Sequence, residues 1–357
     1  MWPINNALSL AYCAPIFYLN EDIVFLICER LISEPTPADD RLAHAKAFSE
    51  TCQRFRYMAA PIILYNVKLR MDQDRISATL QTLERCQYSK NCIRRVSIED
   101  PNLPSAMLVR GLARALNGIK SLTSMESLIM DLVLPRWSDM RSDFLEEVGA
   151  FPQVKELRLC AELAPLAERC VNVTSLFGIL LPSDWTIIDA TRQMNNIQRF
   201  DLKAYWEPEH LEALLNARPD LRELGMLSFE NLGYERVQYA PRSSDEKNGK
   251  AYRGDFRSML AVLAQFWNLR TLAITEVPRL YPYPYEPYEK DPTIEVPELP
   301  VQRLQDIVVN NVFCACRALK VLWIGESIRA TVVRDSLGGV DGVMIGYGKR
   351  RAVAERR

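Results

Sequence analysis

The side chains that could carry chemistry are few and scattered along this sequence. The 357 residues include two histidines, His44 and His210, and nine cysteines. Two histidines argue against a His-rich metal site and against histidine-based acid–base catalysis. The cysteines form no C-x-x-C pair, and none has a histidine partner that the sequence identifies. We therefore predict no catalytic residue, no metal ligand and no cofactor.

A glycine-rich stretch near the carboxyl end does not match a phosphate-binding loop. That loop needs G-x-x-x-x-G-K-[ST], whose backbone N–H groups cradle the phosphates. Here Val343 stands five residues before Gly348, and Arg350 follows Lys349, so the pattern fails at two positions. Residues 340–347 are instead expected to form a last glycine-rich strand or turn. The basic tail after them reads as a solvated terminus or a nuclear-localisation signal.

Composition and charge narrow the class of protein. Lys and Arg total 44 and Asp and Glu total 45, so the formal net charge is −1, which argues against a dedicated nucleic-acid binder. An odd number of dispersed cysteines is typical of reduced thiols, which favours the cytoplasm, the nucleus or both. No apolar run reaches the ~20 residues that span a bilayer, and no basic residues precede the apolar stretch 7–19. We expect neither a signal peptide nor a membrane partner.

The first sixty residues predict three short helices. Asn20 is a plausible N-cap, and apolar residues recur at helical spacing from Ile23 to Leu31. A second helix is expected over 39–50, and a third is expected to stop at Pro61. Three short helices bury little surface by themselves, and each large aliphatic group left in water costs about 1.5–3 kcal/mol relative to burial. This unit should therefore dock on something.

These same residues carry a resemblance to the fungal F-box family. The motifs are Leu-Asn-Glu-Asp-Ile at 19–23, Ala-Phe-Ser-Glu-Thr-Cys-Gln-Arg-Phe-Arg at 47–56, and Ala-Pro-Ile-Ile-Leu-Tyr at 60–65. The resemblance covers about residues 17–66. The sequence departs from the family at Asn20, where proline is usual, and in a longer loop over 33–45.

The resemblance implies a substrate-recruiting subunit of an SCF-type (Skp–cullin–F-box) ubiquitin ligase. In that family the F-box binds a Skp-type adaptor of the cullin complex, and the following domain holds the target protein. Some of the matching side chains must instead build the small core of the F-box, and the sequence does not separate the two sets. The candidate adaptor-binding residues are Leu19, Ile23, Ile27, Phe48, Cys52, Phe55 and Pro61.

One short pattern, apolar–x–x–apolar–x–apolar, returns nine times after residue 63. Its middle positions are 19 to 32 residues apart, except for two gaps of 48 and 50 that hold insertions. The short spacings match the period of leucine-rich repeats. The middle positions are Val67, Val96, Leu128, Leu157, Leu176, Phe200, Leu224, Leu272 and Leu322.

Helices are expected between these strands, for example at 208–215 and 259–266, where leucines recur at helical spacing. Strand and helix in alternation resemble an irregular leucine-rich-repeat solenoid, an α/β horseshoe. The expected domains are the F-box-like unit at 16–63, the solenoid at 64–335 with insertions near 234–254 and 279–300, and a glycine-rich segment with a basic tail at 336–357. A doubly wound α/β enzyme is the alternative fold, but no G-x-G-x-x-G follows an early strand.

In such a solenoid, the residue between the second and third apolar positions points to the concave face, because strand side chains alternate. These residues share no charge sign, which does not favour phosphate tracking. They are Lys68, Ser97, Ile129, Arg158, Asp201, Gly225, Ala273 and Trp323. Ile129 and Trp323 are candidate anchors for a target protein. Tyr283 and Tyr285 lie in a Pro/Tyr-rich insertion that could bind the same target or only pack on its own domain.

The interpretation that combines these observations is a non-enzymatic F-box-like protein with a leucine-rich-repeat-like domain. Its partners would be a Skp-type adaptor with its cullin complex and an unknown target protein. The alternative is a repeat scaffold whose N-terminal helices are only a structural cap, which solenoids need at their ends.

Overall fold

The computed structural model describes the repeat region and a few positions before it. The described residues are 47, 50, 55, 57, 60–61, 63–70, 87–100, 105–132, 148–179, 185–204, 206–227, 256–274, 301–325 and 328–347. Most of the F-box-like segment and both predicted insertions lie outside these ranges.

The described residues form a sheet of 11 strands whose order in space is their order in the sequence. Strands β1 to β9 are parallel, and β10 and β11 are antiparallel additions at one edge. The strands are β1 Asn66–Arg70, β2 Arg95–Asp100, β3 Ser127–Leu132, β4 Glu156–Cys160, β5 Ser175–Ile179, β6 Arg199–Lys203, β7 Glu223–Leu227, β8 Thr271–Ile274, β9 Val321–Ile324, β10 Ile328–Arg334 and β11 Val340–Tyr347.

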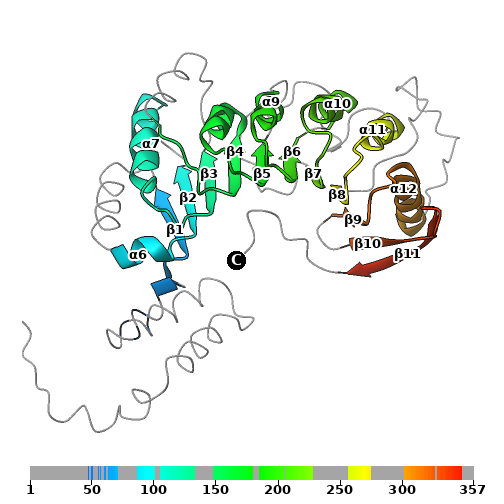
Figure 1. Cartoon of the computed structure of the whole chain (residues 1–357), viewed down its shortest axis with the longest axis horizontal. Coiled ribbons are helices and arrows are strands. Elements are labelled where there is room, and N and C mark those ends of the chain that lie inside the picture. Colours follow the sequence, from blue (N-terminus) through cyan, green and yellow to red (C-terminus); the bar gives the residue numbers. More distant parts are fainter. Residues whose placement is uncertain are drawn as a thin grey trace, which may run out of the picture.

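Helices alternate with these strands and lie along the outer side of a curved sheet (Figure 1). They are α6 Gln87–Cys92, α7 Ser105–Ile119, the 3₁₀ helices η1 Ala161–Arg169 and η2 Thr191–Gln193, α9 Thr186–Ala190, α10 Pro208–Ala217, α11 Phe256–Leu263 and α12 Val301–Ala315. Sequential strand order with helices on one side is consistent with a leucine-rich-repeat-like arrangement. It also argues against a doubly wound sheet, which reverses its strand order and carries helices on both faces.

The register of the sheet confirms the repeat that the sequence predicts. Each middle apolar residue pairs with its equivalent in the next strand, from Val67 opposite Val96 to Leu272 opposite Leu322. From Val96 to Leu322 this row is at most 1 % exposed and packs against the helices. A one-residue slip would turn the row to the other face, so the apolar spacing fixes the register.

From Met125 to Leu319, the first apolar position of each unit closes a turn before the strand. The N–H of Ile197 donates to the Met194 carbonyl at 3.3 Å, and that of Leu319 donates to the Cys316 carbonyl at 3.0 Å. One carbonyl before each strand then accepts two N–H groups of the next unit; Arg222 accepts from Arg270 at 2.8 Å and from Thr271 at 3.0 Å. The ladder therefore continues beyond the strands and satisfies the backbone of the turns.

Helix α10 illustrates how one unit is built. Pro208 stands at its first position, where a missing N–H costs nothing, and the Glu207 side chain and His210 form a reciprocal capping box. Leu211 and Leu214 recur at helical spacing and are fully buried. This confirms the helix that the leucine spacing predicts.

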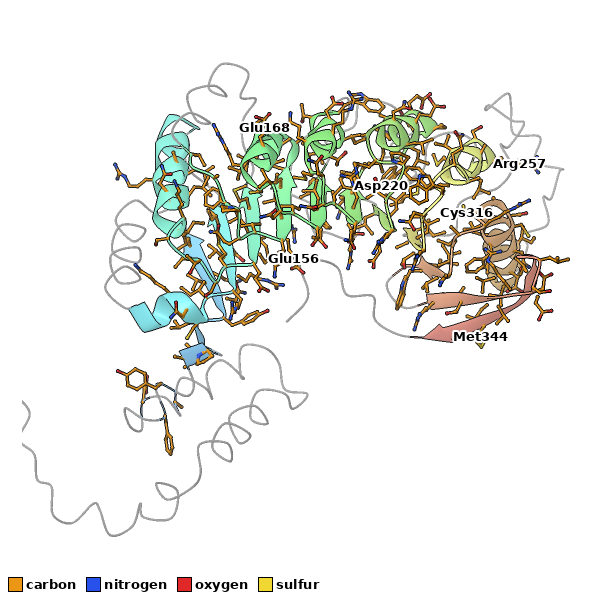
Figure 2. All side chains as sticks on the ribbon, in the orientation of Figure 1. Glu156, Glu168, Asp220, Arg257, Cys316 and Met344 are labelled. Carbon is orange, nitrogen blue, oxygen red and sulfur yellow. The ribbon has the colours of Figure 1, made fainter. Side chains whose placement is uncertain are left out.

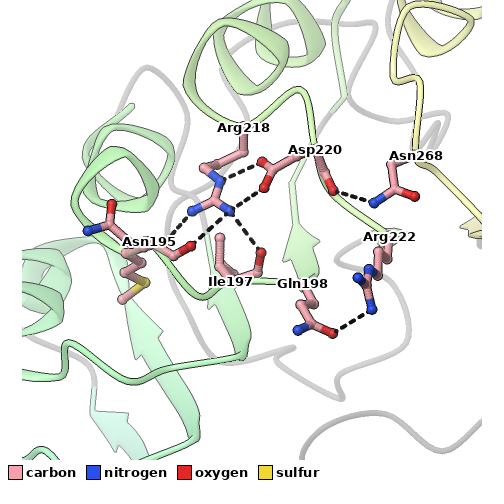
Figure 3. Close-up of polar contacts among 8 residues, drawn as sticks. Asn195, Ile197, Gln198, Arg218, Asp220, Arg222 and Asn268 are labelled. Carbon is pink, nitrogen blue, oxygen red and sulfur yellow. Dashed lines mark hydrogen bonds and ion pairs between the residues drawn. The ribbon is translucent and has the colours of Figure 1, made fainter.

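A buried arginine joins two consecutive units (Figure 3). Arg218, at the end of α10, donates to the carbonyls of Met194, Asn195 (3.4 Å) and Ile197 (3.0 Å), all in the turn of the preceding unit. Asp220 binds the same guanidinium through both carboxylate oxygens, at 2.9 and 2.8 Å. The clamp satisfies carbonyls that face no strand partner.

The chain reverses after β9, which the repeat pattern does not foresee. Strand β10 pairs antiparallel with β9, and a turn at 335–339 leads into β11. In that turn the Asp335 carboxylate accepts the N–H groups of Leu337 and Gly339, and Gly338 has φ +82°, a conformation that favours glycine. The glycine-rich strand predicted over 340–347 is therefore present as β11.

The described positions of the third N-terminal helix extend past Pro61, so the prediction that it stops there is wrong. Positions 55, 57, 60, 61 and 63 are helical, and the N–H of Leu64 donates to the Ala60 carbonyl at 2.8 Å. A proline removes only its own backward bond, so later N–H groups can still close the last turn. The carbonyl of Tyr65 then accepts the N–H groups of Arg94 and Arg95, so the helix leads directly into the first strand.

Candidate functional site

The inner face of the sheet is a continuous surface on which the repeat places non-core side chains. Glu156 lies on this inner side, whereas Glu168 lies on the outer, helical side (Figure 2). One row across the face is formed by the residues between the two core positions of each strand. In register, it is Lys68, Ser97, Ile129, Arg158, Phe177, Asp201, Gly225, Ala273 and Trp323.

The two predicted anchors on this row differ in exposure. Trp323 is half-buried, whereas Ile129 is only 6 % exposed, so the expectation that Ile129 is exposed is wrong. Neighbouring strands lie about 4.8 Å apart, and curvature brings inner-face side chains closer still, so a mid-sheet aliphatic group is covered by its neighbours. The alternation rule placed the residue correctly, but it carries no information about curvature.

A buried ion pair lies at the middle of the face. Asp201 is 0 % exposed and accepts hydrogen bonds from Nε and Nη2 of Arg199 at 2.9 and 2.7 Å. Arg199 is 7 % exposed, and its Nε also lies 3.7 Å from a Glu223 carboxylate oxygen. Arg199 and Asp201 are two residues apart on β6, so strand alternation brings both to the same face.

Two arginines lie towards the β1 side of that pair. Arg95 is 5 % exposed and its Nη2 lies 3.8 Å from a Glu156 oxygen, two strands away. Arg158 is half-buried, and its guanidinium carbon lies 4.7 Å from the centre of the Phe177 ring. At the other end, the guanidinium carbon of Arg329 lies 5.9 Å from the centre of the Trp323 ring. Each ring holds a cation in place by cation–π attraction.

The sequence reasoning missed several members of this face. Phe177 lies between the second and third apolar positions of its repeat, so the alternation of strand side chains could have placed it on this face. Arg95, Glu156, Arg199 and Lys203 occupy the two flanking rows, at strand positions outside the three-residue pattern. Alternate residues of a strand lie on the same face, so the residues two positions before and two positions after each predicted inner-face residue also lie there. This alternation would have placed all four on the inner face.

The pKa of Lys203 is lowered on this face, so its replacement should change how the free energy of unfolding depends on pH. Burial, and next the positive charge of Arg158, lower the pKa of Lys203 from 10.5 to about 8. Between these values the unfolded chain binds more protons than the folded chain, so stability should rise with pH. We expect K203M to remove a rise on the order of 2 kcal/mol. Urea unfolding at pH 8 and at pH 10.5 measures it.

Lys155 provides the matched control, because its side chain is 60 % exposed. K155M should keep the pH slope of the wild type. An identical slope in K203M and the wild type would contradict the assignment of the lowered pKa to Lys203.

The predicted adaptor-binding residues lie almost entirely outside the described residues. Phe55 is 3 % exposed within this chain and Pro61 is half-buried. A buried Phe55 suits the small core of the N-terminal unit, one of the two roles that the sequence left open. The others lie outside the described residues: Leu19, Ile23, Ile27, Phe48 and Cys52, as do the candidate target-binding residues Tyr283 and Tyr285.

Two buried thiols and the described histidine have structural surroundings. Burial raises the pKa of the Cys170 and Cys316 thiols to about 12, which disfavours a nucleophilic thiolate. His210 accepts the Glu207 N–H at Nδ1 (3.1 Å) and stacks on Trp185, with ring centres 4.4 Å apart. In the described residues, no three His, Cys, Asp or Glu side chains are grouped to hold a metal ion.

Comparison with known proteins assigns no family. No family model matches the chain, and no curated protein matches it. Across the described residues, no helix combines the length and apolar character that crossing a bilayer requires. The inner face is therefore interpreted from its own geometry. It offers two arginines beside aromatic rings, two other arginines beside carboxylates, and a half-buried tryptophan, a combination typical of protein-recognition surfaces.

Proposed function

We propose that this chain is a non-catalytic recognition subunit of an SCF-type ubiquitin ligase. In this proposal the horseshoe-like repeat domain holds a target protein on its inner face. The F-box-like segment, residues 16–63, binds a Skp-type adaptor and through it the cullin complex. The protein would act in the cytoplasm, the nucleus or both.

The observation that carries the target-binding part is the pair of cation–π stacks on the inner face. Arg158 over Phe177 and Arg329 beside Trp323 lie on strands of one hydrogen-bonded sheet. Tryptophan and arginine are the residues most enriched among interface hot spots. Their ring contacts fix the arginine side chains before binding, which lowers the entropy lost when a partner docks.

A rigid repeat domain suits this role because a recruiting subunit contributes proximity and orientation. A target held on a sheet with continuous hydrogen bonding is presented in one position, which raises the effective concentration of its reacting group. The adaptor-binding part rests on the F-box resemblance. The direct connection from the helix at 60–63 into β1 supports it, because the resemblance implies such an exit.

A second candidate is a repeat scaffold whose N-terminal helices only cap the first strand. The 3 % exposure of Phe55 fits a cap that packs within the chain, and it fits the small core of an F-box equally well. Terminal units of solenoids commonly serve as caps. The scaffold should bind no Skp-type adaptor.

Replacing Ile23 and Ile27 together by aspartate should abolish co-purification with a Skp-type adaptor. Both positions fall on the apolar stripe of the first predicted helix, and each introduced carboxylate would have to be desolvated in the interface. The measurement is capture of the purified full chain by immobilised adaptor. The melting temperature of the repeat domain should stay unchanged.

V171D is the matched control, because Val171 is 51 % exposed in a turn of the repeat domain. It makes the same kind of substitution outside the proposed interface, and adaptor capture should persist. Wild-type chain that captures no adaptor would overturn the ligase proposal and leave the scaffold. Capture that survives in the double variant would overturn the assignment of these two residues.

A further inference from the structure

A row of cations lies just before strands β7, β8 and β9, at the rim of the sheet. The row consists of Arg222, Arg270 and Lys320, which occupy equivalent positions in three consecutive units. The backbone shows this equivalence, since the Arg222 carbonyl accepts the N–H of Arg270 and the Arg270 carbonyl accepts the N–H of Lys320. The two joining bonds are 2.8 Å long. All three side chains are exposed.

A second row lies three residues earlier in each unit. Trp267 and Arg317 are equivalent, since each is the second residue of a turn closed by a hydrogen bond from the fourth residue to the first. Arg317 is exposed, and Trp267 is 67 % exposed, more than any other described tryptophan. We name Arg222, Trp267, Arg270, Arg317 and Lys320 the basic rim.

The described residues provide few counter-charges for the side chains of this patch. Within the described part of the chain, the side chains of Arg270, Arg317 and Lys320 have no ion-pair or hydrogen-bond partner. Arg222 reaches only the Gln198 side-chain oxygen, at 3.4 Å (Figure 3). The two carboxylates nearest to Arg222 in sequence are engaged elsewhere: Asp220 binds Arg218, and Glu223 lies beside Arg199.

The cations stop abruptly along the rim. The next equivalent positions are Gln198 and Thr174, which are uncharged, and then Lys155, which pairs with Glu126 at 3.5 Å. The excess positive charge therefore covers only two strand spacings, about 10 Å. A nucleic acid is held by a longer track of cations along its backbone, and the whole chain has a formal charge of −1.

We infer that the basic rim is a docking site for an acidic, extended segment of a protein partner. An extended chain advances about 3.3 Å per residue, so a short run of Asp and Glu spans the three cations. Charge complementarity supplies the attraction, and the exposed indole of Trp267 offers apolar contact at the centre of the interface. This site is separate from the inner face and does not depend on the proposed ligase role.

The test is fluorescence anisotropy of a labelled peptide carrying a run of Asp and Glu, titrated with the full-length chain. R270E with K320E should weaken binding by about tenfold or more, because attraction becomes repulsion at two of three row positions. W267A should weaken binding severalfold while leaving its salt dependence unchanged. Added salt should weaken wild-type binding, because a Debye length of about 10 Å at 0.1 M screens exposed charges.

R94E with K155E is the matched control, since it makes the same change of net charge at the far end of the same row. It should bind the peptide like the wild type, and melting temperatures verify folding of every variant. Equal loss in the control, or no binding by the wild type at low salt, would overturn the inference. So would a single-stranded RNA of equal charge that displaces the peptide at lower concentration.

Discussion

Replacing Asp201 by alanine is expected to lower the free energy of unfolding by about 3–5 kcal/mol. The carboxylate is 0 % exposed and accepts two hydrogen bonds from Arg199, at 2.9 and 2.7 Å. Its removal leaves a guanidinium group that is itself 7 % exposed, with a Glu223 oxygen 3.7 Å from its Nε. A buried charge that loses its partner keeps its desolvation cost.

Urea unfolding of the purified chain measures this loss. R199M combined with D201L should recover most of it, because the pair is then replaced by apolar groups of similar size. R192A is the matched control; it breaks the Arg192–Asp189 pair, in which both side chains are more than half exposed. The control should cost less than about 0.5 kcal/mol. A D201A chain as stable as the wild type would show that the pair is hydrated in solution.

Replacing Arg218 by leucine is expected to cost about 2–4 kcal/mol of the free energy of unfolding. Its guanidinium donates to the carbonyls of Met194 and Ile197 in the preceding unit, and it is held there by Asp220 (Figure 3). Leucine keeps much of the apolar stem but removes the guanidinium donors from both buried carbonyls, of which Met194 keeps the 3.3 Å bond from the Ile197 N–H. The loss of these hydrogen bonds should also weaken the contact between the β6 unit and the β7 unit.

Hydrogen exchange of the backbone distinguishes this local effect from a general one. In R218L, the N–H groups of the turn at 194–198 should exchange faster than those of the turn at 151–154. R222L is the matched control, since Arg222 is exposed and makes a single 3.4 Å bond to Gln198. Equal protection of both turns in R218L would contradict the clamp.

The same device recurs at the end of the sheet. Arg334 of β10 donates to the carbonyls of Phe313 (3.1 Å), near the end of α12, and of Cys316 (3.1 Å) and Leu319 (3.2 Å), in the turn before β9. Cys316 and Leu319 correspond to Met194 and Ile197 in their units. In two turns of the sheet, an arginine from a later element thus donates to the backbone carbonyls of the turn. Arg218 comes from the end of a helix, whereas Arg334 comes from a strand.

The parallel strands β1 to β9 were predictable because their signal is repetitive. An apolar side chain at a middle position, such as Leu224, must reach the helix side to be buried, and only one register allows this in every unit. The inner-face row follows from the same alternation, which places Trp323 and Arg158 without further information. A hairpin such as β10–β11 has no repeat to reveal it, and only its glycine-rich second strand was recognisable.

The candidate site could be listed from the sequence but not interpreted from it. Asp201 was one residue in a row of mixed charge, and its partner Arg199 lay outside the pattern. Whether a charged residue is paired depends on side chains from other strands, and their distances are set by curvature and register together. The basic rim was invisible for the same reason: Arg222, Arg270 and Lys320 are far apart in the chain and form one row only through the stacking of units.

The spacing of apolar residues was enough to predict the period, and with it strands β1 to β9, their register and the face on which their residues lie, because burial of apolar groups acts on every unit alike. Which charges are paired, which apolar groups on the inner face are covered, and which described cations stand together without a paired carboxylate follow only from the folded arrangement. Those properties depend on distances between units, and distances between units are a property of the folded assembly of repeats.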